Sequence, residues 1–238
     1  KDLGVEDNTI VVYSTDNGPH YNTWPDAAIT PFRSEKNTNW EGGYRVPAFV
    51  KWPGKIKPGQ VSNQIMSHLD WLPTLMAAVG EPTIVKDLKQ GRSFGADSFN
   101  VHLDGYNFLP YLTGQSSAGP RDEFFYFSDD GLLVGARVND WKVVYAEQRA
   151  TKFQVWREPF VRLRIPKLFN LRRDPYERAD TDSNTYNTWW ENNSAWIFYG
   201  SAKALNFAQT FREYPSRQAP NSFTVDGVVE QLTRYKGE

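Results

Sequence analysis

The stretch IVVYSTDNGPH, residues 10–20, joins an apolar run to a short polar segment. Its apolar residues predict a strand over residues 9–15 that is buried on both faces, as strands are in a parallel sheet flanked by helices. Asp16 and Asn17 follow at the carboxyl end of this strand, where open α/β sheets collect ligands. Because Asn-Gly is also a strong turn dipeptide, the stretch alone allows two interpretations, a plain turn or a binding site.

The composition is that of a globular protein with one large domain, or with one domain and a smaller companion. The chain has 238 residues, of which 39% are hydrophobic, and a formal net charge of −1. No basic excess is present to neutralise phosphates, which argues against nucleic acid as a partner. No apolar run approaches the roughly 18 residues of a membrane span. The lack of cysteine excludes disulfides, thiolate zinc sites and a cysteine nucleophile within these residues.

The first half of the chain predicts an α/β layered domain. A second strand is expected over residues 46–52, with Pro47 at its first residue or on a sheet edge. A helix is expected over residues 68–79. The apolar residues of this helix that recur at helical spacing are Leu69, Leu72, Met76 and Val79. Residues 81–120 contain many glycines and are expected to form a loop-rich passage between two units.

The second half of the chain predicts an antiparallel meander. Strands are expected at residues 124–127, 132–138, 141–146 and 167–171, with a hairpin turn at Asn139-Asp140. Helices are expected near residues 195–211 and 226–235. The first of these helices carries its apolar side chains on one side, namely Ile197, Ala204, Leu205, Ala208 and Phe211. We therefore place one domain at residues 1–115 and a smaller one, an antiparallel sheet with a C-terminal helix, at residues 116–238.

Asp16 and Asn17 offer a carboxylate and an amide oxygen, which are hard ligands suited to calcium or magnesium. Two residues cannot fill a site of about 6–8 oxygens, so further ligands are expected from elsewhere. Downstream, FRSEKNTNWEGGYRVP at residues 32–47 places Lys36 five residues before Glu41. A lysine ammonium suits an oxyanion, which it meets as a point charge. The alternative is a solvated lysine in a polar loop.

The order of four motifs resembles the second half of a sulfatase of the arylsulfatase type. They are STDNG at residues 14–18, K-x-x-x-x-EGG-x-RVP at 36–47, WPG at 52–54 and DxxPT at 70–74. The region near residue 130 and LFNLRRDPYERAD at residues 168–180 fit the same family. Because the match keeps its order over most of the chain, it is far more specific than any one motif.

The resemblance implies an α/β fold related to the alkaline phosphatases, with a mixed or parallel sheet, followed by a smaller α+β subdomain. It implies a divalent cation, calcium with magnesium possible, whose ligands include Asp16 and Asn17. It also implies that Lys36 contacts the sulfate group. The implied substrate is a sulfated small molecule or glycan, and the implied activity is sulfuric ester hydrolysis.

The family's nucleophile is a formylglycine made from a cysteine or serine in a C/S-x-P-S/A-R motif, and the chain departs from the pattern there. Its Pro215-Ser216-Arg217 has Glu213 at the nucleophile position, and glutamate cannot yield the aldehyde by that route. We expect the formylglycine upstream, in an N-terminal remainder of the same enzyme. This segment would then supply about half of the site and would be inactive alone.

Histidine can transfer protons near neutral pH, and His20, two residues past Gly18, is a candidate general acid for the leaving group. The alternative is a loop histidine bonded to a neighbour. His68 and His102 are expected to be helix-start and loop residues. Arg45 is expected to anchor the EGG segment by pairing with an acid.

Three other functions stay open at this point. One is a phosphodiesterase or phosphonate hydrolase of the same superfamily, and another is a non-catalytic fragment or binding module. The third is sugar binding, because 15% of the residues are aromatic. The candidate stacking residues are Trp189, Trp190 and Trp196, although aromatic side chains more often fill a core.

Overall fold

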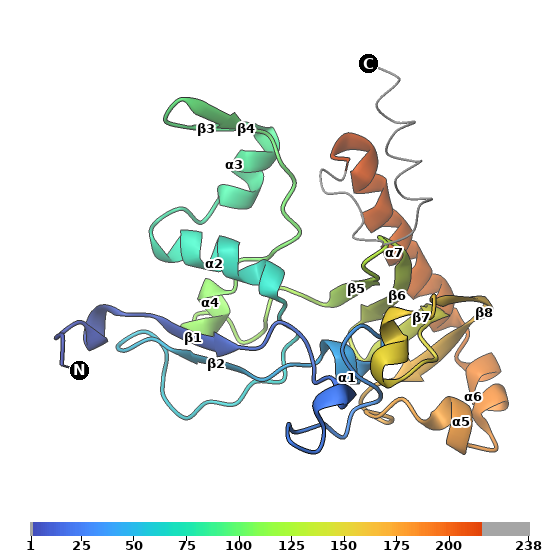
Figure 1. Ribbon diagram of the computed structural model, residues 1–238. Helices are drawn as coiled ribbons and strands as arrows, with labels where there is room; N and C mark the ends of the chain where they lie inside the picture. The colour runs from blue at the N-terminus through green and yellow to red at the C-terminus, as the bar shows by residue number, and fades with distance from the viewer. Residues whose placement is uncertain (1, 216–238) are drawn as a thin grey trace. The chain divides into compact units, whose positions relative to one another are not determined.

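The computed structural model describes residues 2–215 (Figure 1). The chain forms two compact units, each built from two stretches of sequence. Among the described residues, the first unit combines residues 2–15 with Pro47–Phe124, and the second combines Asp16–Val46 with residues 125–215. All four candidate site residues therefore belong to the second unit.

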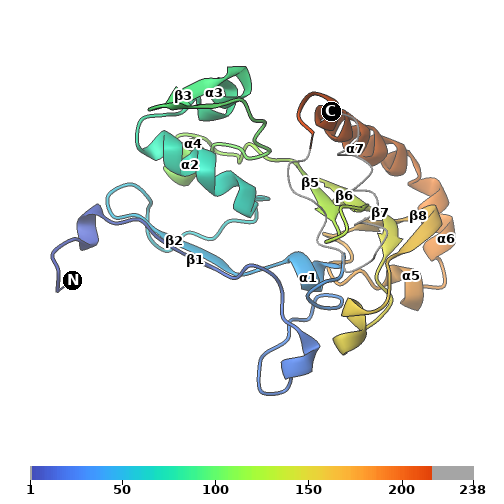
Figure 2. The same ribbon diagram turned by 45° about the horizontal axis from the view of Figure 1, so that its top comes forward.

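The first unit contains two short β-ribbons and several small helices. Its elements are η1 (Glu6–Asn8), β1 (Val11–Ser14), β2 (Ala48–Lys51), η3 (His68–Asp70), α2 (Trp71–Ala78), α3 (Ile84–Gln90), β3 (Arg92–Phe94), β4 (Asp97–Phe99) and α4 (Leu109–Leu112). Figure 2 shows α2 and α4 side by side.

Strands β1 and β2 pair antiparallel, with Val11 opposite Lys51 and Ser14 opposite Ala48. The β2 strand begins at Ala48, so Pro47, which was expected within a strand over residues 46–52, lies just before it. The expectation that the first strand is buried on both faces is wrong, since Tyr13 is 58% exposed and Val11 and Val12 are exposed too. Burial of a strand depends on the elements that pack against it. In this unit β1 pairs with β2 alone, which leaves most of its side chains exposed.

The DxxPT motif is an internal anchor of the first unit. Asp70 is fully buried and its carboxylate accepts hydrogen bonds from Arg121, the shortest of which are Nη2 to Oδ1 at 2.6 Å and Nε to Oδ2 at 2.9 Å. Thr74 is buried, and its hydroxyl oxygen accepts from the Phe108 backbone N–H at 2.9 Å. The motif thus ties α2 to the segment that follows it.

The predicted helix at residues 68–79 is confirmed as η3 followed by α2. Its predicted apolar face is wrong. Leu69, Leu72 and Val79 are exposed, whereas the buried residues of α2 are Pro73, Thr74 and Ala77. The inward-facing side of the helix lies close to neighbouring backbone, which leaves room only for small side chains. At Gly105, for example, an added Cβ would overlap the Leu69 carbonyl.

Residues 81–120, expected to be a loop-rich passage between two units, belong to the first unit and carry short elements between their loops. This stretch holds α3, the β3–β4 hairpin and α4. Its glycines punctuate these elements: Gly91 follows the last residue of α3 with φ of 94°, and Gly95 turns the hairpin with φ of 61°.

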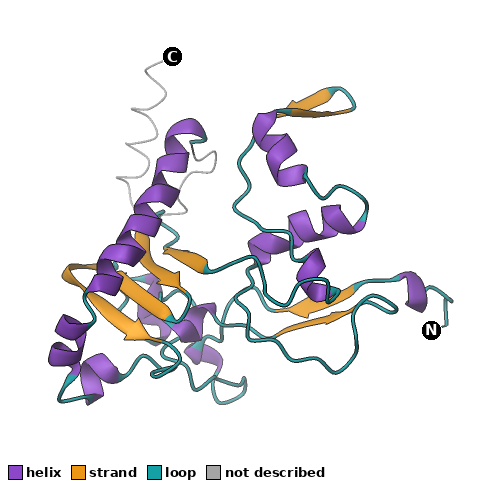
Figure 3. Ribbon diagram, turned by 180° about the vertical axis from the view of Figure 1, so that it is seen from behind, coloured by secondary structure: helices purple, strands orange, loops and turns teal. Residues whose placement is uncertain are grey.

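The second unit is built on one four-stranded sheet in the order β5-β6-β7-β8 (Figure 3). Its strands are β5 (Glu123–Phe127), β6 (Leu133–Val138), β7 (Trp141–Glu147) and β8 (Val161–Asn170). Its helices are η2 (Tyr21–Thr23), α1 (Glu41–Tyr44), η4 (Lys152–Trp156), α5 (Ala179–Asp182), α6 (Tyr186–Asn192) and α7 (Ala195–Glu213). The four predicted strands are confirmed, and β8 begins earlier than expected. The turn at Asn139 is confirmed by its left-handed φ of 51°.

Helix α7 packs along this sheet, as the first and third views show (Figures 1 and 3). Its buried residues are Ile197, Gly200 and Ala204. The side chains of Leu205, Ala208 and Phe211 are exposed, so the predicted face is correct only at its first two residues. Gly200 lets the helix approach β7, since an added Cβ would lie 2.9 Å from Val143 Cγ2. The short helix expected at 226–235 lies outside the described residues.

The three tryptophans considered for sugar binding pack within the protein. Trp141 stacks on Trp189 and Trp196, with ring centroids 5.7 and 4.9 Å apart. Trp190 donates its ring N–H to the Pro166 carbonyl at 2.9 Å. All three pack against the buried cluster of Val143, Leu168 and Ile197. These three tryptophans therefore pack against the core of the second unit, and the interpretation that they bind sugar is wrong. No helix between residues 2 and 215 is both long and apolar enough to cross a membrane.

Candidate functional site

Three segments of the second unit meet through their backbones: the DNG segment, the loop that carries Lys36, and α1 with its EGG sequence. The N–H of Gly18 donates to the Gly43 carbonyl at 2.9 Å, and the N–H of Lys36 donates to the Pro19 carbonyl at 2.9 Å. The N–H of Gly42 donates to the Arg33 carbonyl at 2.7 Å. These bonds fix the main chain of Lys36 beside the segment that carries Asp16 and His20.

Glycine is required where these segments cross. A Cβ on Gly18 would overlap the Gly42 carbonyl, and one on Gly42 would overlap the carbonyl oxygens of Arg33 and Ser34. A Cβ on Gly43 would lie 2.6 Å from the Glu35 carbonyl oxygen. The glycines of DNG and EGG thus permit backbone contact that no other residue allows.

Lys36 sits in a tight turn. Ser34 and Asn37, on either side of it, adopt left-handed φ values of 62° and 63°. The Thr38 hydroxyl donates to the Glu35 carbonyl at 2.6 Å and closes the turn. The Lys36 side chain is half-buried, with Nζ 5.8 Å from the centroid of the Trp156 ring.

Asp16 and Asn17 form a local turn at the end of the first strand. Asp16 Oδ1 accepts from the Asn17 backbone N–H at 3.0 Å, and Asn17 Nδ2 donates to the Gly18 carbonyl at 2.8 Å. The second bond orients the amide, so that its oxygen faces away from Gly18. Carboxylate and amide oxygens fit a hard cation such as calcium. Asp16 and Asn17 could supply only part of a ligand set, and residues 2–215 hold no cluster of three or more His, Cys, Asp or Glu side chains suited to a metal.

His20 and Lys36 both contact Trp156, a residue of η4 that lies more than a hundred positions away in sequence. The Trp156 ring N–H donates to His20 Nε2 at 3.4 Å, and the two rings meet edge to face with centroids 6.1 Å apart. His20 Nε2 also lies 3.6 Å from Glu35 Oε2. Trp156 therefore links the histidine and the lysine.

Glu35 is a fully buried carboxylate next to Lys36. Its Oε2 accepts from the Tyr21 backbone N–H at 2.7 Å, and its Oε1 accepts from the Lys152 backbone N–H at 2.6 Å. Burial, followed by the charge of Glu35, raises the pKa of the Tyr21 phenol. Glu35 thereby ties the first residues of η2 and η4 to the Lys36 turn.

The EGG helix is anchored by a buried ionic network. Lys142 Nζ lies 3.1 Å from Glu41 Oε1 and 2.7 Å from Glu177 Oε1. The Glu41 backbone N–H donates to Glu177 Oε2 at 2.7 Å, which satisfies one free donor at the start of α1. Arg45 Nε donates to Glu41 Oε2 at 2.9 Å, which confirms the expected pairing of Arg45 with an acid.

This network sets the protonation of both glutamates. Burial alone would raise the pKa of Glu41, but the charges of Lys142 and Arg137, with Arg45, lower it to about 2. Burial raises the pKa of Glu177, and the Lys142 ammonium offsets this only in part. Burial, more than the nearby Glu41 charge, raises the pKa of the Tyr126 phenol, whose hydroxyl donates to Glu41 Oε1 at 2.8 Å.

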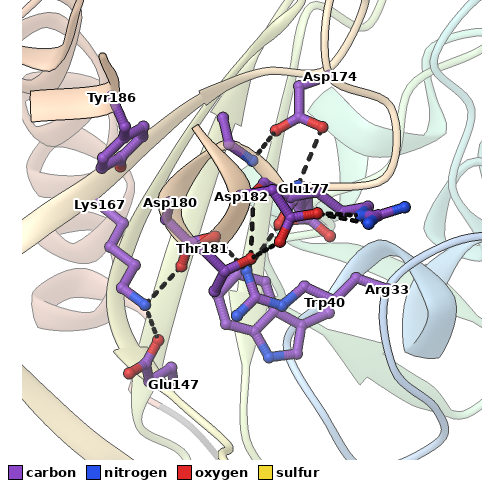
Figure 4. Close-up of polar contacts among 12 residues, drawn as sticks. Arg33, Trp40, Glu147, Lys167, Asp174, Glu177, Asp180, Thr181, Asp182 and Tyr186 are labelled. Atoms are coloured by element: carbon purple, nitrogen blue, oxygen red, sulfur yellow. Dashed lines mark hydrogen bonds and ion pairs between the residues drawn. The ribbon is translucent and has the colours of Figure 1, made fainter. Parts of the chain in front are cut away.

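A second network holds the segment before Lys36 (Figure 4). The Arg33 guanidinium lies 3.5 Å from the Trp40 ring centroid and donates to Asp180 Oδ1 at 2.9 Å. Lys167 bridges Asp180 and Glu147, with Nζ–O distances of 2.7 and 2.6 Å. The Lys36 turn is thus attached to β8 and to the start of α5.

Sequence reasoning named His20 and Lys36, which both contact Trp156, but missed Trp156 and Glu35, the two residues that link them. Glu35 read as one more charge in a polar loop, and Trp156 gave no signal because its contacts come from distant positions. His68 begins η3 and bonds to the Thr15 carbonyl at 2.9 Å. His102 lies in a loop, 3.2 Å from Asp104. Both agree with their expected structural roles.

Comparison with known proteins identifies the class. A family model described as Sulfatase matches residues 1–81. Human arylsulfatase A is 31% identical over 187 residues, which cover 74% of this chain and 34% of that protein. Human N-acetylgalactosamine-6-sulfatase is 30% identical over 204 residues, 75% of this chain and 34% of that protein. The solved PsFucS1 sulfatase from Pseudoalteromonas sp. superimposes with a TM-score of 0.71 at 24% identity, covering 91% of this chain and 40% of its own.

These matches define an α/β fold of the alkaline phosphatase-like class, in its sulfatase form. The chain belongs to the sulfatase family. It spans about a third of the length of the curated relatives described above.

Proposed function

We propose that the protein hydrolyses sulfate esters and that Asp16, Asn17, His20 and Lys36 form part of the active site, here termed the sulfate-ester site. The observation that carries the proposal is the backbone crossing of the DNG, Lys36 and EGG segments. Gly18 bonds to Gly43 and Lys36 bonds to Pro19, each at 2.9 Å. The motifs that resemble those of sulfatases thus meet in space, at a backbone contact that requires glycine.

In this proposal Lys36 binds a sulfate oxygen through its ammonium. At about 4 Å and an effective dielectric near 20, such a contact is worth roughly 4 kcal/mol before desolvation. Asp16 and Asn17 supply two oxygen ligands to calcium, or to magnesium. When bound, the cation withdraws charge from the sulfate oxygens and makes sulfur more open to attack.

His20 serves as the general acid. It donates a proton to the bridging ester oxygen as the S–O bond breaks, so that the alcohol leaves neutral. The net reaction consumes one water and yields an alcohol and hydrogen sulfate. The nucleophile is the formylglycine implied by the family, supplied from outside these 238 residues.

Substitution of Lys36 tests the proposal directly. In the whole protein that contains this sequence, we expect Lys36→Ala to lower kcat/KM for 4-nitrophenyl sulfate by about 100-fold or more, the scale of removing one oxyanion donor. Lys55→Ala, at an exposed lysine, is the matched control. Activity of Lys36→Ala within twofold of the parent would refute the role. Hydrolysis of bis-4-nitrophenyl phosphate in preference to the sulfate would favour a phosphodiesterase instead.

The metal role has a readout that does not depend on turnover. We expect Asp16→Ala to lower the calcium content measured by elemental analysis of the purified protein. Asp26→Ala, at an exposed aspartate, should keep the parent content. An unchanged calcium content in Asp16→Ala would contradict the assignment.

A further inference from the structure

Helix η4 is fastened against the sulfate-ester site by three contacts from different parts of its length. They are Lys152 N–H to Glu35 Oε1 at 2.6 Å, Asn37 Nδ2 to the Val155 carbonyl at 2.7 Å, and Trp156 Nε1 to His20 Nε2 at 3.4 Å. Val155 is also buried at 2% exposure. The helix is therefore fixed beside His20 and Lys36 before any ligand arrives.

This fixed helix presents two aromatic rings to solvent. Phe153 is 52% exposed and Trp156 is 41% exposed. In a 3₁₀-helix residues i and i+3 are eclipsed and separated by about 6 Å along the axis. The two rings therefore share one face of η4 and follow one another at about the spacing of adjacent rings in an extended sugar chain.

The same segment carries positive charge beside each ring. The Arg157 guanidinium lies 4.9 Å from the Phe153 ring centroid, and Lys36 Nζ lies 5.8 Å from that of Trp156. Lys152 is exposed at the start of the helix. Exposed aromatic faces beside cations fit a ligand with apolar ring faces and anionic substituents.

We propose that Phe153 and Trp156 form a stacking platform for a sulfated oligosaccharide, which rests on the proposed function for the sulfate-ester site. Trp156, which contacts His20 and lies over Lys36, takes the sugar that carries the ester. Phe153 takes the neighbouring sugar, and Arg157 pairs with an anionic group on it. A small aryl sulfate fills only the sulfate-ester site and gains nothing from Phe153.

The test compares two kinds of substrate. We expect Trp156→Ala and Phe153→Ala each to lower kcat/KM for sulfated tetrasaccharides by about tenfold relative to kcat/KM for 4-nitrophenyl sulfate. The tetrasaccharides are prepared from chondroitin sulfate, heparin and carrageenan. Phe198→Ala removes another exposed ring, on α7, and should leave the ratio of the two rates unchanged. Trp156→Phe retains the stacking face and should recover most of the loss.

Two kinetic outcomes overturn the platform. Equal losses on both substrates in Phe153→Ala would show a structural role, and unchanged ratios in both alanine variants would show that neither ring is used. If the parent hydrolyses neither substrate, the proposed function fails, and calorimetric binding of the same tetrasaccharides becomes the test. Binding that Phe153→Ala and Trp156→Ala weaken and Phe198→Ala does not would then still support the platform, while no binding would refute it.

Discussion

The α-carbon of Gly18 lies against the carbonyl of Gly42 so closely that a Cβ on Gly18 would overlap the Gly42 oxygen. These glycines come from the two motifs that carry the proposed metal ligands and follow the proposed sulfate-binding lysine. Their contact brings the motifs together and depends on Gly18 having no side chain, while Gly42 needs none for its own contact with Arg33 and Ser34.

Replacement of Gly18 by alanine should therefore damage the fold locally. Overpacking a filled interior costs typically 1–3 kcal/mol, and backbone cannot yield as a flexible side chain does. We expect Gly18→Ala to lower the free energy of unfolding by about 3 kcal/mol, measured by urea titration followed by tryptophan fluorescence. Asn22→Ala, in the exposed part of η2, is the control. A Gly18→Ala protein as stable as the parent would mean that the segments can separate at no cost.

The buried Glu41 should make the second unit sensitive to acid. The pKa of Glu41 is lowered to about 2 from an ordinary 4.5, because the Lys142, Arg137 and Arg45 charges outweigh its burial. The unfolded chain then binds a proton more readily than the folded one, so stability present above pH 4.5 falls as the pH drops toward 2. We expect Glu41→Gln to be less stable at pH 7 and to lose less stability between pH 4.5 and 2.

Urea midpoints at pH 7, 5, 4 and 3 measure this difference. Glu191→Gln, at an exposed residue of α6, should keep the parent slope. Glu177 works in the opposite direction, since its raised pKa makes its ionised form unfavourable in the fold and favours the folded state as the pH falls. A parent whose stability does not decrease below pH 4.5 would contradict the balance assigned to Glu41.

The Asp70–Arg121 pair should be essential to the first unit. Both side chains are buried, and removal of one partner from a buried pair leaves an uncompensated charge at a cost of about 3–5 kcal/mol. We expect Arg121→Met to destabilise the protein on that scale, measured as a lower midpoint in urea. The double variant Arg121→Met with Asp70→Asn should recover part of the loss. Failure of the second change to restore any stability would show that the charge on Asp70 is not the cause.

Strands and turns were predicted correctly where they depend on neighbouring residues in the sequence. All four predicted strands of the second unit were found, although β8 begins earlier than expected, and the turn at Asn139 has the left-handed φ that suits asparagine. The region around α3 was missed because its glycines were taken for loop, whereas Gly91 and Gly95 end a helix and turn a hairpin. Glycine often lies where a helix or strand ends. A stretch with many glycines can therefore contain several short helices and strands as well as loops.

Burial and the connections of the site needed the three-dimensional structure. The apolar residues around Tyr13 in the sequence predict a core position. Its side chain is nevertheless exposed, because exposure depends on what packs against β1. Asp16, Asn17, His20 and Lys36 could be named because each lies in or beside a motif. Trp156 could not, because an aromatic residue in a polar stretch has no pattern that reveals a partner more than a hundred residues away.

The attachment of Arg33 to Asp180 and to the Glu177 carbonyl has a consequence for biosynthesis. Residues 33–43 are translated before the groups that hold them, which lie some 140 codons further along the message. During translation the turn that bears Lys36 lacks these contacts until the segment with Glu177 and Asp180 has left the ribosomal exit tunnel. The ordering of this turn therefore depends on a segment that the ribosome makes much later than the turn itself.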